Sequence, residues 1–316
     1  MLSLHHLTKR FGDLQALDRV DLTVERGQML GFLGPNGAGK TTTMRAIMGL
    51  ITLDDGEVRW NSQVVDATAR RRFGYMPAER GMYPKMAVRE QLIYFARLAG
   101  VGSATARRAA DEWMGRLGID ARADDPVQAL SSGNQQRVQL AISLVHNPEL
   151  LILDEPFSGL DPVAVETMSE VIAEQLLKGV AVLFSSHQLD LVSSICRDVA
   201  IIEGGRIVLQ GDVAELRQRS SARYVTVGFA TDEPWRPEQQ ITADAVVITS
   251  EPRRTRLRVS ATTDPATLLA AATRHGVVTE FSFTPPDLSE VFRSAVGGHG
   301  AEPASGLAHE IGGGHG

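Results

Sequence analysis

The segment GPNGAGKT, residues 34–41, has the residue types and spacing to bind a phosphate chain. It matches the pattern G-x-x-x-x-G-K-[ST] in full, after an apolar run typical of a strand and before a stretch typical of a helix. Its glycines let successive backbone N–H groups turn toward one anion, and the following helix N-terminus favours negative charge. Lys40 would supply a compact cation for β- and γ-phosphates, and Thr41 a hydroxyl for Mg²⁺. The candidate nucleotide-binding residues are therefore Gly34, Pro35, Asn36, Gly37, Ala38, Gly39, Lys40, Thr41 and Thr42.

Two adjacent carboxylates end a second apolar run, in the segment LLILDEP, residues 150–156. Such a run is typical of a buried strand in a parallel sheet, and functional groups gather at the carboxyl ends of these strands. Asp154 is expected to hold Mg²⁺, directly or through a water, because hard cations prefer oxygen ligands. Glu155 is the candidate to polarise the attacking water. Two carboxylates in this position would be costly as a purely structural feature, which favours the functional interpretation.

The elements that must position these residues alternate between strand and helix patterns. Continuous apolar runs such as LLILD and VAVLF, separated by helical stretches, predict an α/β fold with a mostly parallel sheet covered on both faces. Amphipathic periods between residues 82 and 146 predict a helical subdomain inserted into that core. None of the apolar runs approaches the roughly 20 residues that a membrane span requires.

The pattern changes beyond about residue 220. Residues 224–229, 245–249 and 255–261 alternate like half-buried strands. Asp264 followed by Pro265 predicts the start of a helix, and VVTEFSFTP and DLSEVFRSAV predict a further strand and helix. We therefore expect a small α+β domain at residues 223–296, and we expect the Gly-rich residues 297–316 to be disordered.

The bulk composition excludes several classes of protein. At roughly 150 residues per domain, a chain of 316 residues suggests about two domains. A net charge of −6 argues against a nucleic-acid surface. The single cysteine, Cys196, cannot form a disulfide within the chain and is expected to be a small buried residue. The first residues, MLSLHHLTKRFG, lack the apolar core of a signal peptide, so we expect a cytoplasmic protein.

A third motif, LSSGNQQRVQLAISLVHNP, lies between the other two. It resembles the signature Leu-Ser-Gly-Gly-Gln of ATP-binding cassette (ABC) proteins: Leu130, Ser131 and Gly133 match, whereas Ser132 and Asn134 replace a glycine and a glutamine. Small polar residues at a helix N-terminus make an anion site. The resemblance covers roughly residues 1–220 as one cassette. It implies the P-loop ATPase fold of this family, with an N-terminal antiparallel β part, a mostly parallel core and a helical subdomain.

The resemblance assigns further roles. Ser131 and Gly133 would grip the γ-phosphate of ATP bound to the opposite subunit of a head-to-tail dimer, and Asp161, in SGLD, would lie in the loop that crosses that interface. Phe11 matches the aromatic residue that stacks on adenine, and His187 matches a histidine that contacts the γ-phosphate. The implied cofactors are ATP and Mg²⁺. The implied catalytic residues are Glu155, His187 and Lys40, and the implied metal ligands are Thr41 and Asp154.

Partners also follow from the resemblance. A cassette of this kind works with a separate transmembrane permease and a second ATP-binding subunit, which is either an identical copy or a sister cassette. It lies on the inner face of the cell membrane through its permease. The segment DLSEVF, residues 287–292, resembles the ending SLEEIF of an extra domain on some ABC ATPases, and analogy with those cassettes favours an exporter.

Two alternatives stay open at this stage. One is a soluble ABC ATPase acting in translation or DNA repair, although this chain has a single cassette, no long coiled coil and no zinc motif, and its acidic balance gives no reason to expect a nucleic-acid partner. The other is a nucleotide-binding regulator that no longer hydrolyses ATP. The presence of Lys40, Asp154, Glu155 and His187 argues against it.

One position departs from the family pattern. In GYMPAERGMYPKM, residues 74–86, Ala78 stands where the family has a glutamine that helps complete the shell of Mg²⁺ and water. Some relatives with the same C-terminal domain read PEERG here, so the loop tolerates a different residue. Glu79 could substitute only if the loop shifted by one residue, and otherwise an ordered water would fill the gap. We predict retained but slow hydrolysis with a looser dependence on Mg²⁺.

Overall fold

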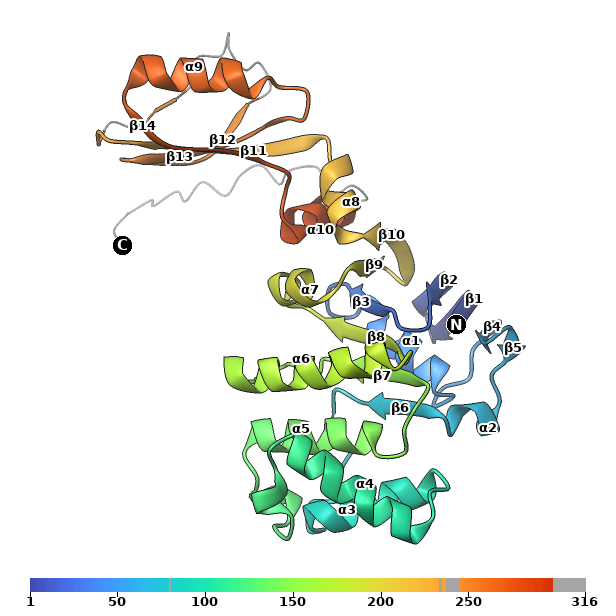
Figure 1. Ribbon diagram of the computed structural model, residues 1–316. Helices are drawn as coiled ribbons and strands as arrows, with labels where there is room; N and C mark the ends of the chain where they lie inside the picture. The colour runs from blue at the N-terminus through green and yellow to red at the C-terminus, as the bar shows by residue number, and fades with distance from the viewer. Residues whose placement is uncertain (80, 233–234, 237–244, 298–316) are drawn as a thin grey trace, which may run out of the picture.

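The computed structural model describes residues 1–79, 81–232, 235–236 and 245–297 (Figure 1). Disorder is expected for residues 297–316; residue 297 ends a helix, and residues 298–316 lie outside the described residues. In the described ranges the chain forms three sheets with helices packed against them.

A six-stranded sheet with the order β10-β9-β3-β8-β7-β6 carries the predicted phosphate and carboxylate motifs. Five of its strands run parallel to their neighbours, and β10 is antiparallel to β9. Leu30 and Phe32 of β3 are buried on one face of the sheet, and Met29 and Leu33 are buried on the other. Because side chains alternate between faces, a strand covered on both sides must be apolar throughout. The strands are β3 (Met29–Leu33), β6 (Phe73–Met76), β7 (Leu150–Asp154), β8 (Ala181–Ser186), β9 (Asp198–Glu203) and β10 (Arg206–Asp212).

An antiparallel sheet from the N-terminal part covers one face of this core. Its strands, in the order β2-β1-β4-β5, are β1 (Leu2–Phe11), β2 (Leu14–Val24), β4 (Asp55–Trp60) and β5 (Gln63–Val64). Leu4 and Leu17 of this sheet form one buried cluster with Met44 of helix α1 (Lys40–Ile47) and Phe32 of β3. The short helix α2 (Ala67–Arg70) follows, with the Asp66 side chain accepting from the backbone N–H of Ala69. The mostly parallel core and the antiparallel part confirm the predicted fold class.

Helices cover the opposite face of the six-stranded sheet (Figure 1). Val138 of α5, Met168 of α6 and Val192 of α7 join Leu151 and Phe184 of the sheet in a second buried cluster. Cys196 is buried in the same cluster, as expected for a small apolar residue, and its pKa is raised by that burial. The helices of this region are α3 (Val88–Leu98), α4 (Ser103–Arg116), α5 (Ser132–Leu144), α6 (Pro162–Leu177) and α7 (Leu189–Ile195), with short 3₁₀ helices at Asp120–Arg122 and Val127–Ala129.

The third sheet, entirely antiparallel, has the order β12-β13-β11-β14. Helix α9 covers one of its faces, burying Leu268 against Val225 and Leu257 (Figure 1). Asp264 caps this helix as predicted, since its carboxylate accepts from the N–H groups of Ala266 and Thr267. The elements are α8 (Val213–Arg219), β11 (Ala222–Phe229), β12 (Val246–Glu251), β13 (Arg254–Ser260), α9 (Pro265–His275), β14 (Val278–Thr284) and α10 (Leu288–Gly297).

Helix α10 joins the third sheet to the core of the cassette. Its Leu288 is buried in the same cluster as Val192 of α7, and Phe292 packs against that cluster. The guanidinium Nε of Arg217, in α8, donates to the carbonyl of Pro286 at 2.7 Å, immediately before α10. Helix α10 therefore contacts the cassette through Leu288 and Phe292 and the third sheet through the ion pair of Glu290 with Arg256 of β13. Every helix in the described ranges is too short or too polar to serve as a membrane span.

Candidate functional site

The predicted phosphate loop connects β3 to α1 through backbone that needs glycine. Gly39 has a φ of +114°, and a Cβ built there would lie 2.7 Å from the carbonyl oxygen of Ala16. A Cβ on Gly34 would lie 2.4 Å from the carbonyl oxygen of Ile202. A side chain at either position would collide with backbone, so both positions require glycine for the loop to approach the neighbouring strands.

The Lys40 ammonium lies over this loop and is buried. Its Nζ donates to the carbonyl oxygens of Gly34 at 2.7 Å and Pro35 at 3.1 Å. Burial lowers the pKa of Lys40 from its ordinary value, while the charges of Glu155 and Asp154 oppose that change. The loop thus holds a cation beside two carboxylates at the opening of the site, where a phosphate chain would find positive charge and backbone donors.

Asp154 is the last residue of β7 and is buried. The Ser185 hydroxyl donates to its Oδ1 at 2.6 Å, whereas its Oδ2 has no hydrogen-bond partner among the described residues. An unpaired oxygen of a buried carboxylate is costly, and a hard cation is the partner that would satisfy it. With the Thr41 side chain lining the same cavity, these residues fit the donor set that Mg²⁺ prefers.

Glu155 follows in a conformation that is unusual for a residue with a side chain, with a φ of +54°. Such a conformation costs about 1–3 kcal/mol and persists where surrounding contacts enforce it. Here the Glu155 N–H donates to the Ser185 hydroxyl at 3.0 Å. The amide of Gln136 donates to the carbonyls of Glu155 at 3.3 Å and Pro156 at 2.9 Å. The carboxylate Oε2 of Glu155 lies 2.9 Å from the imidazole Nδ1 of His187.

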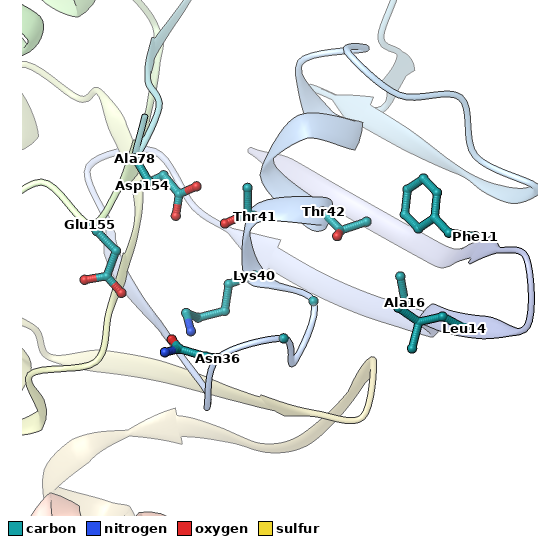
Figure 2. A pocket seen from close by; sticks show the side chains of 12 residues that line it. Phe11, Leu14, Ala16, Asn36, Lys40, Thr41, Thr42, Ala78, Asp154 and Glu155 are labelled. Carbon is teal, nitrogen blue, oxygen red and sulfur yellow. The ribbon is translucent and has the colours of Figure 1, made fainter. Parts of the chain in front are cut away.

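These residues border a cavity of about 380 Å³ (Figure 2). Asp154 and Glu155 lie at one end, Phe11 and Leu14 lie at the other, and Lys40 lies between them. Phe11 is 49% exposed, so its ring is free to stack on a planar group rather than buried in the core. An apolar aromatic end and a charged end suit the base and the phosphates of a nucleotide. The lining residues are Phe11, Leu14, Ala16, Asn36, Gly37, Gly39, Lys40, Thr41, Thr42, Ala78, Asp154 and Glu155.

Gly34, Pro35 and Ala38 belong to the phosphate loop but do not line the cavity, and three further predicted binding residues lie outside both the loop and the cavity. Ser131 caps α5, its hydroxyl accepting from the Asn134 N–H at 3.4 Å, and Gly133 lies in the first turn of that helix. Asp161 caps α6, its carboxylate accepting from the Ala164 N–H at 2.8 Å. Their predicted roles concern ATP bound to another subunit, and those roles stay predictions.

The loop that lacks the family glutamine is held by a residue from α5. The buried Gln139 donates from Nε2 to the carbonyl of Pro77 at 2.9 Å and to the carbonyl of Glu79 at 3.4 Å, on either side of Ala78. Ala78 itself lines the cavity. The Glu79 side chain is 90% exposed and lies 3.9 Å from the Arg45 guanidinium, so the loop has not shifted to place Glu79 in the site.

Sequence reasoning missed three residues that build this site: Gln136, Gln139 and Ser185. The position of Ser185 in the sequence could have indicated its role, because it lies two residues before the predicted site residue His187, at the end of a strand. The sequence indicates the roles of Gln136 and Gln139 less clearly. Both are polar residues on the buried side of a helix with apolar neighbours, where an amide needs a hydrogen-bond partner.

Comparisons with known proteins agree with this geometry. A family model described as ABC transporter matches residues 17–158, and one described as the C-terminal domain of DrrA1-3-like ATP-binding proteins matches residues 211–296. ABC transporter ATP-binding protein YhaQ of Bacillus subtilis is 38% identical over 303 residues, which is 94% of this chain and 99% of the relative. Nod factor export ATP-binding protein I of Cupriavidus metallidurans is 32% identical over 304 residues, 94% of this chain and 97% of the relative.

A solved structure of an ATP binding subunit of an ABC transporter aligns with a TM-score of 0.65 and 30% identity, over 69% of this chain and 92% of that one. The similarity spans the cassette with its phosphate loop and carboxylates, and the full-length relatives extend it through the third sheet. This chain belongs to the ATP-binding proteins of the ABC transporter family, in the group that carries the additional C-terminal domain.

Proposed function

We propose that this chain hydrolyses ATP and that the hydrolysis drives a separate membrane permease which exports its substrate. The observation that carries the ATPase activity is one cavity lined by the buried Lys40, by Asp154, whose Oδ2 has no partner among the described residues, and by Glu155, whose carboxylate contacts His187. The export direction is supported by the full-length similarity to a protein named for Nod factor export.

Each residue of the cavity has its own role in this proposal. Phe11 stacks on the adenine, and the N–H groups of the loop hold the phosphates together with Lys40. Thr41 and Asp154 would hold Mg²⁺, and the ion would neutralise charge on the phosphate oxygens. Glu155 accepts a proton from the attacking water, and His187 keeps the Glu155 carboxylate in place.

A second ATP-binding subunit completes the site in this proposal. Ser131 and Gly133, at the start of α5, grip the γ-phosphate of ATP held by the partner cassette, and Asp161 lies in the loop that crosses the interface. A permease would hold the pair of cassettes at the inner face of the cell membrane.

Phosphate release from ATP by the purified chain tests the activity. Lys40→Met should lower turnover by roughly 100-fold, because it removes a cation from the transferred phosphate. Lys178→Met is the matched control: Lys178 is exposed at the end of α6, outside the cavity, and its loss should leave turnover unchanged. Equal turnover in both variants and the unchanged chain would overturn the assignment of this cavity.

The partner is tested separately. The tagged chain is expressed with its neighbouring genes, captured from detergent-solubilised membranes and analysed by mass spectrometry. We expect a protein with several membrane spans in a fixed ratio to this chain. Recovery with ribosomes or DNA, and with no membrane protein, would support the translation or repair alternative instead.

A further inference from the structure

A second cavity lies between the third sheet and helix α10, far along the chain from the nucleotide site. It has a volume of about 590 Å³, within the range of small-molecule sites. The lining residues that matter here are Tyr224 of β11, Ile248 of β12, Arg258 of β13, Pro286, and Glu290 and Arg293 of α10. Strands β11 and β13, the edge strand β12 and helix α10 therefore line one cavity.

Positive charge in this cavity is not balanced by the described residues. Arg254, Arg256 and Arg258 alternate along β13 and so lie on one face of the sheet, opposite the face that α9 covers. Arg254 forms an ion pair with Glu280 at 3.0 Å, and Arg256 forms one with Glu290 at 3.1 Å. The guanidinium of Arg258 has no such partner in the described ranges, and the same is true of Arg293 on α10.

The acidic residue Glu290 also lines the cavity, but it already forms an ion pair with Arg256. Its side chain is 7% exposed, and its Oε1 accepts from Arg256. Its Oε2 accepts from the backbone N–H of Asp287 at 3.0 Å, at the start of α10. Each carboxylate oxygen of Glu290 therefore accepts a hydrogen bond within this cluster, and its charge is already paired with a third arginine.

The remaining walls combine a hydroxyl with apolar surface. Tyr224 lines the cavity together with Arg258 and Arg293; burial and the nearby Glu290 carboxylate raise its pKa, and the charges of the two arginines partly oppose this. Arg256 lies over the Tyr224 ring at 4.8 Å from its centre and holds it in place. Ile248 is 45% exposed and, with Pro286, offers an apolar wall beside the charged groups.

We propose that this cavity binds a small organic anion through Arg258 and Arg293, with its apolar part against Ile248. Guanidinium groups bind carboxylates and phosphates through two parallel hydrogen bonds, and Arg258 and Arg293 line one hollow with no ion pair of their own among the described residues. The concave shape favours a small molecule, because attraction to a membrane surface usually takes clusters of 4–8 basic residues, and this hollow offers two.

An anion bound in this cavity would contact helix α10, which joins the third sheet to the cassette. Glu290 and Arg293 line the cavity from α10, whereas Leu288 and Phe292 of the same helix pack against the cassette cluster that contains Val192 of α7. Helix α7 begins two residues after His187. The proposed anion site is therefore separated from the nucleotide site by two packed helices.

Calorimetric titration of the full chain tests the site. Excess ADP keeps the nucleotide cavity filled, and citrate and fructose 1,6-bisphosphate serve as probes that distinguish carboxylate from phosphate recognition. We expect saturable binding of at least one probe, one anion per chain. Arg258→Gln and Arg293→Gln should each weaken that binding about tenfold or more, because each removes a charged hydrogen-bond donor.

Arg254→Gln is the matched control, since Arg254 lies on the same strand and face but is paired with Glu280 and does not line the cavity. The affinity of Arg254→Gln should stay within about twofold of that of the unchanged chain, whereas a tenfold loss corresponds to about 1.4 kcal/mol. Absence of saturable binding of both probes, or equal affinity in all three variants, would overturn the proposal. Flotation with phosphatidylglycerol vesicles covers the membrane alternative: vesicle binding that needs Arg258 and Arg293, without binding of either probe, would also overturn it.

Discussion

The imidazole Nδ1 of His187 lies 2.9 Å from the carboxylate Oε2 of Glu155, although 32 positions separate the two residues in the chain. They meet because β7 and β8 are parallel neighbours, with Asp154 paired to Ser185, so that the segments following both strands leave the sheet at the same edge. An imidazole beside a carboxylate fixes the direction in which that carboxylate points. This pair is the structural basis for assigning proton transfer to Glu155.

Substitution of His187 should therefore impair hydrolysis more than nucleotide binding. His187→Ala leaves the Glu155 carboxylate free to rotate, and we expect turnover to fall by roughly 100-fold, the lower range for loss of a positioned general base. Binding of a fluorescent ATP analogue should change little. His5→Ala, on the exposed part of β1, is the control. Unchanged phosphate release in His187→Ala would remove His187 from the site.

A glutamine at position 78 should restore a missing contact. Ala78 lines the nucleotide cavity, whereas the Glu79 side chain is 90% exposed. Ala78→Gln should place an amide in the cavity, raise turnover and lower the Mg²⁺ concentration needed for half-maximal activity. Glu79→Gln, outside the cavity, should alter neither quantity. If Ala78→Gln changes neither turnover nor metal dependence, this loop does not act in catalysis here.

The loop around Ala78 should depend on Gln139. Gln139→Leu removes the donor to the carbonyls of Pro77 and Glu79, at a cost of about 1–3 kcal/mol for leaving polar groups without partners. Hydrogen–deuterium exchange should accelerate in residues 76–79 and 81–83. Gln136→Leu, in the same helix, should instead accelerate exchange near Glu155 and Pro156. Identical exchange patterns in the two variants would contradict these separate roles.

The sequence allowed the fold class and the local parts of the site to be predicted, for a physical reason. The phosphate loop, Lys40 and Thr41 lie within one strand-turn-helix segment, and Asp154 ends a strand whose neighbours run parallel to it. The bonds from Gln139 to Pro77, 62 positions away, could not be predicted, because they depend on how α5 packs against the end of β6. The contact of α10 with the cassette was missed for the same reason.

Stability should fall in mildly acidic solution because of His146. This half-buried residue lies with its Nε2 3.1 Å from the carbonyl oxygen of Phe73. Burial lowers the pKa of His146, and the Phe73 carbonyl only partly opposes this. Below the ordinary histidine pKa of about 6.5, the unfolded chain binds a proton that the folded chain resists, so the free energy of unfolding decreases as the pH falls.

His146→Gln removes the titrating imidazole but keeps an amide that can donate to the carbonyl of Phe73. We expect the urea midpoint of the variant to change less between about pH 7 and pH 5 than that of the unchanged chain. His5→Gln, at an exposed position, serves as the control. A steeper or equal pH dependence in His146→Gln would show that other groups govern acid sensitivity.

The central claim, that this cavity hydrolyses ATP with Glu155 accepting the proton of the attacking water, is tested most directly by Glu155→Gln. The side chain keeps its shape but loses its basicity, so turnover should fall by roughly 100-fold or more while ATP still binds. Phosphate release measures the turnover. Gel filtration of the same sample should show intact ATP retained by a dimer of the chain. Phosphate release at the rate of the unchanged chain would contradict the account.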